Sequence, residues 1–145
     1  DMAKACTAAL LAAVLFPQLP AAAAVAGAAA VAGHIFPFYL RFRGGKGFAP
    51  FLGLTLALDW RFFLVIVAVV LVITLVTDYI VIGTFTTIAS FPAYLGLFAK
   101  AGWLVVAAVC VASLVIFAKH FVNIQRLLTG QEIGLRRAMS KKDRV

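Results

Sequence analysis

Six apolar runs follow one another along this chain, separated by short segments that contain Pro, Gly or charged residues. None of the runs shows the alternation of apolar and polar residues expected for strands of a closed membrane barrel. A continuous apolar run of this kind is typical of a buried or membrane-embedded helix. The pattern therefore predicts six helices, whose apolar parts are residues 5–19, 21–32, 48–58, 62–76, 79–99 and 103–118.

Several of these predicted helices are short for a membrane. A helix needs about 20 residues to cross a hydrocarbon core of about 30 Å, and the runs at 21–32 and 48–58 fall well below that length. Such segments extend past these bounds, thin the bilayer locally, or form half-helices. Small residues four positions apart in 21–32 allow helices to approach closely in lipid. We expect an all-α integral membrane protein, a polytopic bundle of about six short transmembrane helices.

Composition supports the membrane class. Of the 145 residues, 65% are hydrophobic and 12% are charged, whereas soluble domains average about 25% charged residues. A net charge of +8 would suggest nucleic acid in a soluble protein, but here the basic residues gather at the ends of apolar runs. We therefore expect contact with membrane lipid and no nucleic-acid partner. Cys6 and Cys110 lie far apart and provide neither a disulfide framework nor a metal-binding spacing.

The charges also predict an orientation. If all six segments cross the membrane, the N-terminus, the loop 33–47, the turn at Thr77-Asp78 and the C-terminal tail share one face. That face carries all of the 13 Lys and Arg residues except Arg61 and Lys100. The positive-inside rule makes it cytoplasmic. We expect one domain over residues 1–145, with a cytoplasmic motif and basic tail over 119–145.

A cationic, glycine-rich loop between the second and third runs is the first candidate for chemistry. It contains Arg43 and Lys46 together with Gly44, Gly45 and Gly47. Glycines bring backbone N–H groups close to a ligand, and Arg and Lys supply charge that binds anions. The loop therefore predicts an anion site at a bilayer surface. A plain positive-inside anchor is the alternative.

The tail begins with a second polar motif, in which His120, Asn123 and Arg126 have helical spacing. If the last helix continues past Ala118, these side chains share one face. That face would present groups able to bind and activate a substrate. The alternatives are an interfacial His bonded to backbone carbonyls and an Asn that caps or links helices.

A cluster of hydroxyls in the fifth run is a third candidate, with Thr84 at its start. Such hydroxyls either contact a ligand or bond back to carbonyls of their own helix. Well-known catalytic motifs are absent. The sequence contains no phosphate loop, no HExxH or paired Cys/His metal set, no H-x4-D acyltransferase motif and no nucleophile elbow. We expect neither a metal nor a cofactor.

Two separated motifs carry a resemblance to a known family. They are Gly33-His34-x-Phe36-Pro37-x-x-Leu40-x-Phe42-x-Gly44-Gly45-Lys46-Gly47 and His120-x-x-Asn123-Ile124-x-Arg126-Leu127-x-x-Gly130-x-Glu132. In this order they closely resemble the PlsY family of bacterial membrane acyl-phosphate:glycerol-3-phosphate acyltransferases. The first residues, Asp1-x-x-Lys4, resemble the start of the second helix in that family.

The resemblance implies seven helices in a complete member. The chain is therefore expected to be a fragment that lacks the first helix and an early S-G-N-x-G-x-x-N motif. The family's R-Y-V-S-L-x-S-I segment corresponds to residues 78–85, where Val81 replaces the first Ser and Thr84 the second. Asp78 stands where the resemblance implies a basic residue.

The implied activity is transfer of a fatty acyl group from acyl phosphate to the sn-1 hydroxyl of glycerol 3-phosphate, which gives lysophosphatidic acid and phosphate. The implied location is the bacterial inner membrane, with the site facing the cytoplasm.

The expected catalytic residues are Lys46, Thr84, His120 and Asn123. The expected phosphate-binding residues are Arg43, Gly44, Gly45, Lys46, Gly47 and Arg126. A small membrane transporter or channel subunit for a phosphorylated anion is the alternative, and a purely structural subunit is a third interpretation.

Overall fold

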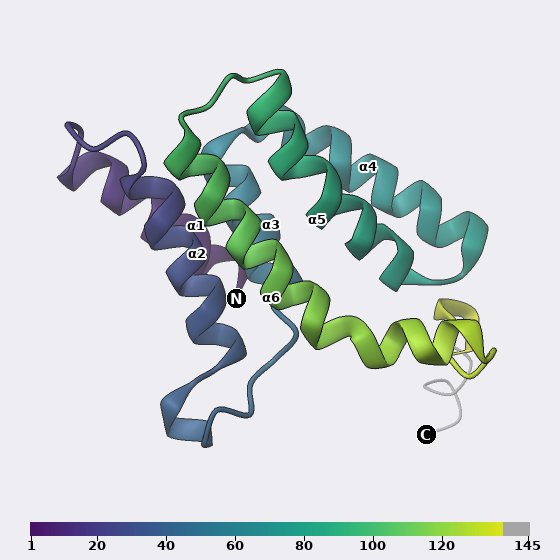
Figure 1. The fold of residues 1–145 in the computed structure, drawn as a ribbon. Coiled ribbons are helices and arrows are strands. Elements are labelled where there is room, and N and C mark those ends of the chain that lie inside the picture. The colour runs from purple at the N-terminus through teal and green to yellow at the C-terminus, as the bar shows by residue number, and fades with distance from the viewer. Residues whose placement is uncertain (138–145) are drawn as a thin grey trace.

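The computed structural model describes residues 1–137, and it contains six α-helices within that range (Figure 1). The basic tail residues Lys141, Lys142 and Arg144 lie outside the described residues. The helices are α1 (Met2–Leu15), α2 (Ala22–Ile35), α3 (Phe48–Leu58), α4 (Trp60–Thr77), α5 (Ile80–Leu97) and α6 (Trp103–Leu128), and a 3-10 turn, η1 (Phe38–Leu40), follows α2.

The all-α fold class predicted from the sequence is confirmed. Helices α2, α4, α5 and α6 belong to segments long and apolar enough to cross a membrane, whereas α1 and α3 are shorter apolar helices of 14 and 11 residues. The main difference from the prediction is at the end of α6, which continues ten residues beyond Ala118 to Leu128. No Pro or Gly interrupts this stretch before Gly130, so the helix carries the polar tail motif directly out of the bundle.

The helices form two groups of three. Helix α1 packs on α2 and α3, and α5 packs on α4 and α6. Contacts of α2 with α6 and of α3 with α4 join the two groups, and Figure 1 shows α6 running across the molecule between them. At the centre the ring of Phe51 on α3 meets the ring of Phe91 on α5 edge to face, with 6.1 Å between centroids. The buried core cluster around these rings includes residues of α3, α5 and α6.

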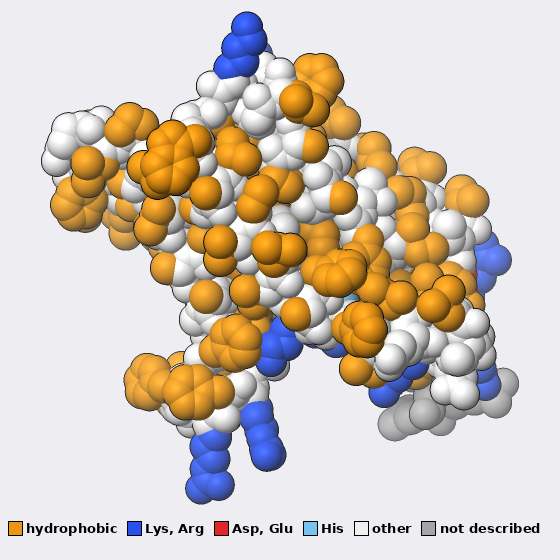
Figure 2. Space-filling view, viewed as in Figure 1, with side chains coloured by type: hydrophobic (Ala, Val, Ile, Leu, Met, Phe, Trp, Pro, Cys, Tyr) orange, Lys and Arg blue, Asp and Glu red, His pale blue; other side chains and the backbone are white. Residues whose placement is uncertain are grey.

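Much of the outer surface is apolar. Large side chains such as Val14, Leu71 and Leu97 are exposed on three different helices, and hydrophobic side chains cover most of the body in Figure 2. In water such a surface would cost free energy in proportion to its area. In lipid it carries no such cost, so the exposed apolar helices agree with a multi-pass membrane protein.

The polar loops meet at one end of the bundle, as their predicted shared face requires. His34 lies 3.4 Å from the carboxylate of Asp1, Lys46 contacts Asn123, and Arg136 contacts Asp78. These pairs join the N-terminus, the glycine-rich loop, the α4–α5 turn and the tail. In Figure 2 the Lys and Arg side chains project mainly from this end.

At the opposite end, Asp59 fixes the start of α4. Its Oδ1 accepts hydrogen bonds from the backbone N–H groups of Arg61 and Phe62 at 2.9 and 3.0 Å, which is how an N-cap satisfies the first amides of a helix. Its Oδ2 accepts a hydrogen bond from the Tyr94 hydroxyl of α5 at 2.7 Å. One carboxylate thus links α4 to α5.

This arrangement predicts an acid-sensitive step in stability. The hydrogen bond from Tyr94 is the largest cause that lowers the pKa of the Asp59 carboxyl. Partial burial acts in the opposite direction and raises the pKa. The backbone amides of Phe62 and Arg61 and the charge of Arg61 lower it further. Because the folded-state pKa lies below the unfolded one, the contribution is present at neutral pH and is lost as the pH falls through the folded-state pKa. When thermal unfolding is measured between pH 7 and about 3, the unfolding temperature of the native protein is expected to fall more steeply with decreasing pH than that of Asp59→Asn. Equal slopes would contradict this role.

Candidate active site

A cavity of about 350 Å³ lies at the polar end, where α3, α5 and α6 meet. The last turn of α2 contributes His34. The loop before α3 contributes Lys46 and Gly47, and the first turn of α3 contributes Phe48 and Ala49. The remaining lining residues come from α5, α6 and the segment that follows α6: Ile80, Val81, Thr84, His120, Asn123 and Glu132. The structure therefore brings the predicted residues Lys46, Gly47, Thr84, His120 and Asn123 to one cavity.

A chain of hydrogen bonds runs along one wall of this cavity. The Nζ of Lys46 donates to Oδ1 of Asn123 at 2.8 Å, and Nδ2 of Asn123 donates to Oε1 of Glu132 at 2.7 Å. Asn123 is 7% exposed, so its amide orientation is set by a cation on one side and a carboxylate on the other. Asn123 thus holds the Lys46 ammonium at the cavity while Glu132 holds Asn123.

His120 lies one turn before Asn123 and is 5% exposed. Its Nδ1 lies 3.0 Å from the carbonyl oxygen of Ile116. Because a carbonyl only accepts hydrogen bonds, Nδ1 carries the proton, and in the neutral imidazole Nε2 is the unprotonated nitrogen. The edge-to-face contact with Phe85, at 6.0 Å between centroids, further fixes the ring. A fixed imidazole with a free basic nitrogen is suited to accept a proton.

Thr84 is buried at the cavity, with 2% of its surface exposed. Its hydroxyl donates to the carbonyl of Ile80 at 3.3 Å, and Thr86 and Thr87 make the same i−4 bonds. The alternative in which these hydroxyls bond back to their own helix is therefore realised. The oxygen of Thr84 still has an acceptor site free, because a hydroxyl donates one hydrogen bond and accepts others.

The glycine-rich loop differs from the predicted anion nest. The amide of Gly44 donates to the carbonyl of Ile35 at 3.2 Å, and the amide of Gly45 donates to the carbonyl of His34 at 3.3 Å. These two amides close the loop onto the end of α2. At Gly45 a Cβ atom would overlap the His34 ring, so the glycine serves close packing.

Gly47 lines the cavity and is the N-cap of α3, with a left-handed φ of 87°. The start of a helix favours anions, because its first amides lack partners within the helix. Lys46 and the start of α3 therefore supply the positive potential that the sequence assigned to the whole loop.

Two predicted arginines do not line the cavity. Arg43 and Arg126 are both exposed, on the loop before α3 and on the last turns of α6. The backbone carbonyl of Arg126 accepts from the amides of Gln131 and Glu132 at 2.7 and 3.1 Å, so this residue helps turn the chain back toward the site. Their predicted phosphate contacts stay predictions.

Glu132 is the residue that our sequence-based site prediction missed. It belongs to the second motif, but it was not assigned a site role. The signal in the sequence was Gly130, because a glycine after a helix favours a turn. In the structure Gly130 has a φ of 68°, and the chain reverses there after α6. Such a reversal returns the following acidic side chain to the helix face that carries Asn123.

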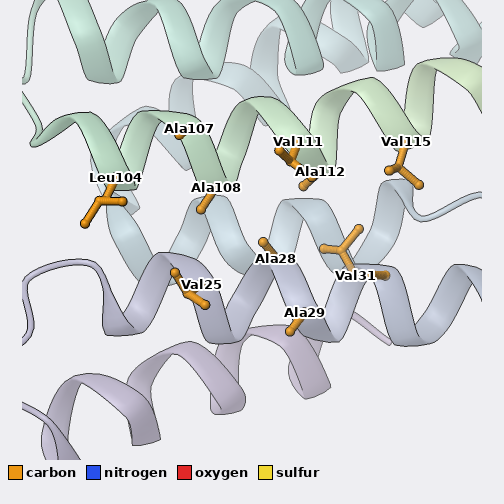
Figure 3. Close-up of a pocket in the computed structure, with 11 residues that line it drawn as sticks. Val25, Ala28, Ala29, Val31, Leu104, Ala107, Ala108, Val111, Ala112 and Val115 are labelled. Carbon is orange, nitrogen blue, oxygen red and sulfur yellow. The ribbon is translucent and has the colours of Figure 1, made fainter.

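Two further cavities adjoin α2. One, of about 420 Å³, adjoins the site through His34 and is lined by Asp1, Lys4, Gly44 and Gly45 among others. The other is an apolar groove of about 410 Å³ between α2 and α6, and Figure 3 shows Ala and Val side chains of both helices along it. Within the described residues no three His, Cys, Asp or Glu side chains are arranged to hold a metal ion.

Comparison with known proteins bears directly on this geometry. The family model for glycerol-3-phosphate acyltransferase matches residues 1–130. The chain belongs to that family. Crystal structures of PlsY, described as an integral membrane glycerol 3-phosphate acyltransferase, are similar to this fold at 32% identity. The lysophosphatidic acid form matches with a TM-score of 0.85 over 92% of this chain and 68% of that one. The glycerol 3-phosphate form matches with a TM-score of 0.81 over 88% and 63%.

Curated relatives are also glycerol-3-phosphate acyltransferases by name. The protein of Brucella canis is 37% identical over 126 residues, which cover 87% of this chain and 61% of the relative. That of Lactiplantibacillus plantarum is 33% identical over 134 residues, covering 91% and 63%. The chain thus spans about three-fifths of the length of these curated relatives.

Proposed function

We propose that the protein is an acyltransferase that moves a fatty acyl group from acyl phosphate to the sn-1 hydroxyl of glycerol 3-phosphate. The observation that carries the proposal is the link from Lys46 through Asn123 to Glu132, beside His120 in the same cavity. A reaction between two phosphate-bearing substrates needs positive charge that neutralises their repulsion. Family membership supports the acceptor, and the proposed donor rests on the resemblance in both motifs.

In the proposed reaction the acceptor hydroxyl attacks the acyl carbonyl carbon of the mixed anhydride. A new ester C–O bond forms, the C–O bond to phosphate breaks, and inorganic phosphate leaves with the electron pair. Phosphate is a good leaving group, so no covalent enzyme intermediate is required. Positioning of the substrates and neutralisation of charge by Lys46 then supply most of the acceleration. Arg43 and Arg126, which are both exposed, are proposed to contact the second phosphate.

The hydroxyl proton has two possible acceptors. One is Nε2 of His120, which is unprotonated in the tautomer fixed by Ile116. The other is a substrate phosphate oxygen. Asn123 lies one turn further along α6 and keeps Lys46 in place in either case. The two routes differ in how much rate is lost when His120 is replaced.

The acyl chain is proposed to lie in an apolar groove of about 420 Å³ between α5 and α6. Phe85 connects this groove to the site, because it lines the groove and contacts His120. The groove opens toward the lipid-facing surface. A membrane-dissolved donor then reaches the cavity without passing through water.

The groove leads to a prediction about chain length. Ala89→Phe fills this groove, and kcat/KM for palmitoyl phosphate is expected to fall about tenfold more than that for octanoyl phosphate. Ala107→Phe is the matched control, because Ala107 is also exposed but lines the other groove, between α2 and α6. A selective loss in Ala107→Phe instead would place the acyl chain there.

The polar end is proposed to face the cytoplasm of a bacterium, with the protein as a single transmembrane domain in its inner membrane. The clustering of Lys and Arg at that end supports the orientation. Arg61 and Lys100 lie at the other end. A cysteine placed at Arg43 is expected to react with a membrane-impermeant thiol reagent only after the cells are opened.

The proposed function is tested with full-length protein reconstituted in lipid. Given acyl phosphate and glycerol 3-phosphate, it is expected to form lysophosphatidic acid and release phosphate in equal amounts. Uptake of glycerol 3-phosphate or phosphate into proteoliposomes, with no acyl transfer, would favour the transporter alternative. Full function after replacement of residues in both motifs would favour a structural subunit.

A further inference from the structure

The segment that follows α6 is tied to the turn between α4 and α5. The amide of Leu135 donates to the backbone carbonyl of Asp78 at 2.8 Å, and the amide of Arg136 donates to Oδ1 of Asp78 at 2.8 Å. The guanidinium of Arg136 donates to the carbonyl of Leu75 at 3.1 Å. We refer to these three bonds as the Asp78 clasp. Its two side-chain bonds join positions 58 and 61 residues apart in the chain.

The clasp depends on an acidic residue in an unusual backbone conformation. Asp78 ends α4 in the left-handed region, with φ 70° and ψ 0°, and its own amide donates to Thr74. Asp and Asn adopt this conformation more readily than most residues. A basic side chain at this position would have no oxygen to accept the Arg136 amide. The carboxylate therefore specifies where the tail docks.

Gly134 fits against the same carboxylate. It is buried, and a Cβ atom at this position would overlap the Asp78 side chain. The tail thus passes Asp78 with backbone against carboxylate. The absence of a side chain at Gly134 leaves the space that the Asp78 carboxylate occupies.

The clasp begins three residues after Glu132, at Leu135, and Glu132 is the residue that holds Asn123 in the candidate site. On its other side, the amide of Glu132 donates to the carbonyl of Arg126. Glu132 is therefore fixed between the end of α6 and the α4–α5 turn. We propose that Asp78 is a positioning residue for the site, because it keeps Glu132 on Asn123 and, through Asn123, keeps Lys46 at the cavity. This inference rests on the proposed function for its kinetic readout.

The principal test variant is Asp78→Gly. Glycine is the favoured residue in a left-handed position at a helix end, so the variant removes the carboxylate without straining α4. We expect kcat/KM for glycerol 3-phosphate to fall about tenfold, with the unfolding temperature unchanged. Asp78→Asn retains the Oδ1 acceptor and is expected to recover most of this loss. Equal impairment of the Asn and Gly variants, or full activity of both, would overturn the inference.

A double-mutant cycle separates positioning from a general structural effect. If Asp78 acts through Glu132, Asp78→Gly adds little further loss in a Glu132→Ala background. A loss as large as in the native background would show that Asp78 acts by another route and would overturn the inference.

Amide hydrogen exchange provides a readout that does not depend on activity. Asp78→Gly is expected to raise exchange over residues 131–136, including the Glu132 amide. Unchanged exchange at Glu132 would overturn the inference whatever the protein catalyses. If instead exchange rises as expected and the native protein transfers no acyl group, the positioning of Glu132 stands and the proposed function fails.

Discussion

Replacing Lys46 with Met is expected to lower kcat/KM for acyl transfer by about 10²–10³-fold, the range for losing one preorganised group that stabilises developing charge. Met keeps most of the length of the side chain and removes the ammonium. Without that charge, the repulsion between two phosphate-bearing substrates is no longer offset, and Oδ1 of Asn123 loses its donor. Initial rates of phosphate release, measured against both substrates in proteoliposomes, check the expectation.

Lys119→Met is the matched control for this experiment. Lys119 also lies at the polar end, but its ammonium contacts the face of the Phe36 ring at 4.5 Å and does not line the cavity. We expect its activity to stay within about twofold of native, as for a surface substitution. Equal losses in the two variants would mean that the total positive charge of this end matters, and that Lys46 has no specific role. Full activity of Lys46→Met would remove it from the site.

The sequence predicted the helices well because lipid imposes one requirement throughout. Every backbone group in the membrane must bond within its own segment, so an uninterrupted apolar run becomes a helix. The run at 48–58 became α3 with the same bounds. The end of α6 was less predictable, because the continuous apolar run ends at Ala118 while the α-helix continues to Leu128. Polar residues extend a helix past an apolar run without leaving a hydropathy signal.

The site was predictable in its residue types and less so in its contacts. Spacing alone placed His120 and Asn123 on one face, and the structure adds Lys46 from a position 77 residues away in sequence. The amides of Gly44 and Gly45 could not be assigned, because their partners are carbonyls at the end of α2. Composition indicates that a loop binds anions, but which amides remain free depends on how the loop closes.

Replacing His120 with Gln distinguishes the two possible proton acceptors. If Nε2 accepts the hydroxyl proton, kcat is expected to fall by about 10²–10⁴-fold, the usual contribution of a positioned general base, with little change in KM. The loss of kcat at low pH that protonation of this imidazole causes would also disappear. Stopped assays across pH 5.5 to about 8.5, a range that covers imidazole titration, measure both effects.

A substrate phosphate as the base predicts a different result for the same variant. The proton acceptor is then part of the substrate, so His120→Gln would retain kcat within about tenfold of native. The decrease of kcat at low pH would also remain. His120 would then act on binding, and its loss would appear in KM. Phe85→Leu is the accompanying control: it removes the ring that packs against His120 and leaves the imidazole and its bond to Ile116. A fall in kcat there as large as in His120→Gln would show that the orientation of the imidazole is as important as its presence, because the proton is transferred only along the direction in which Nε2 points.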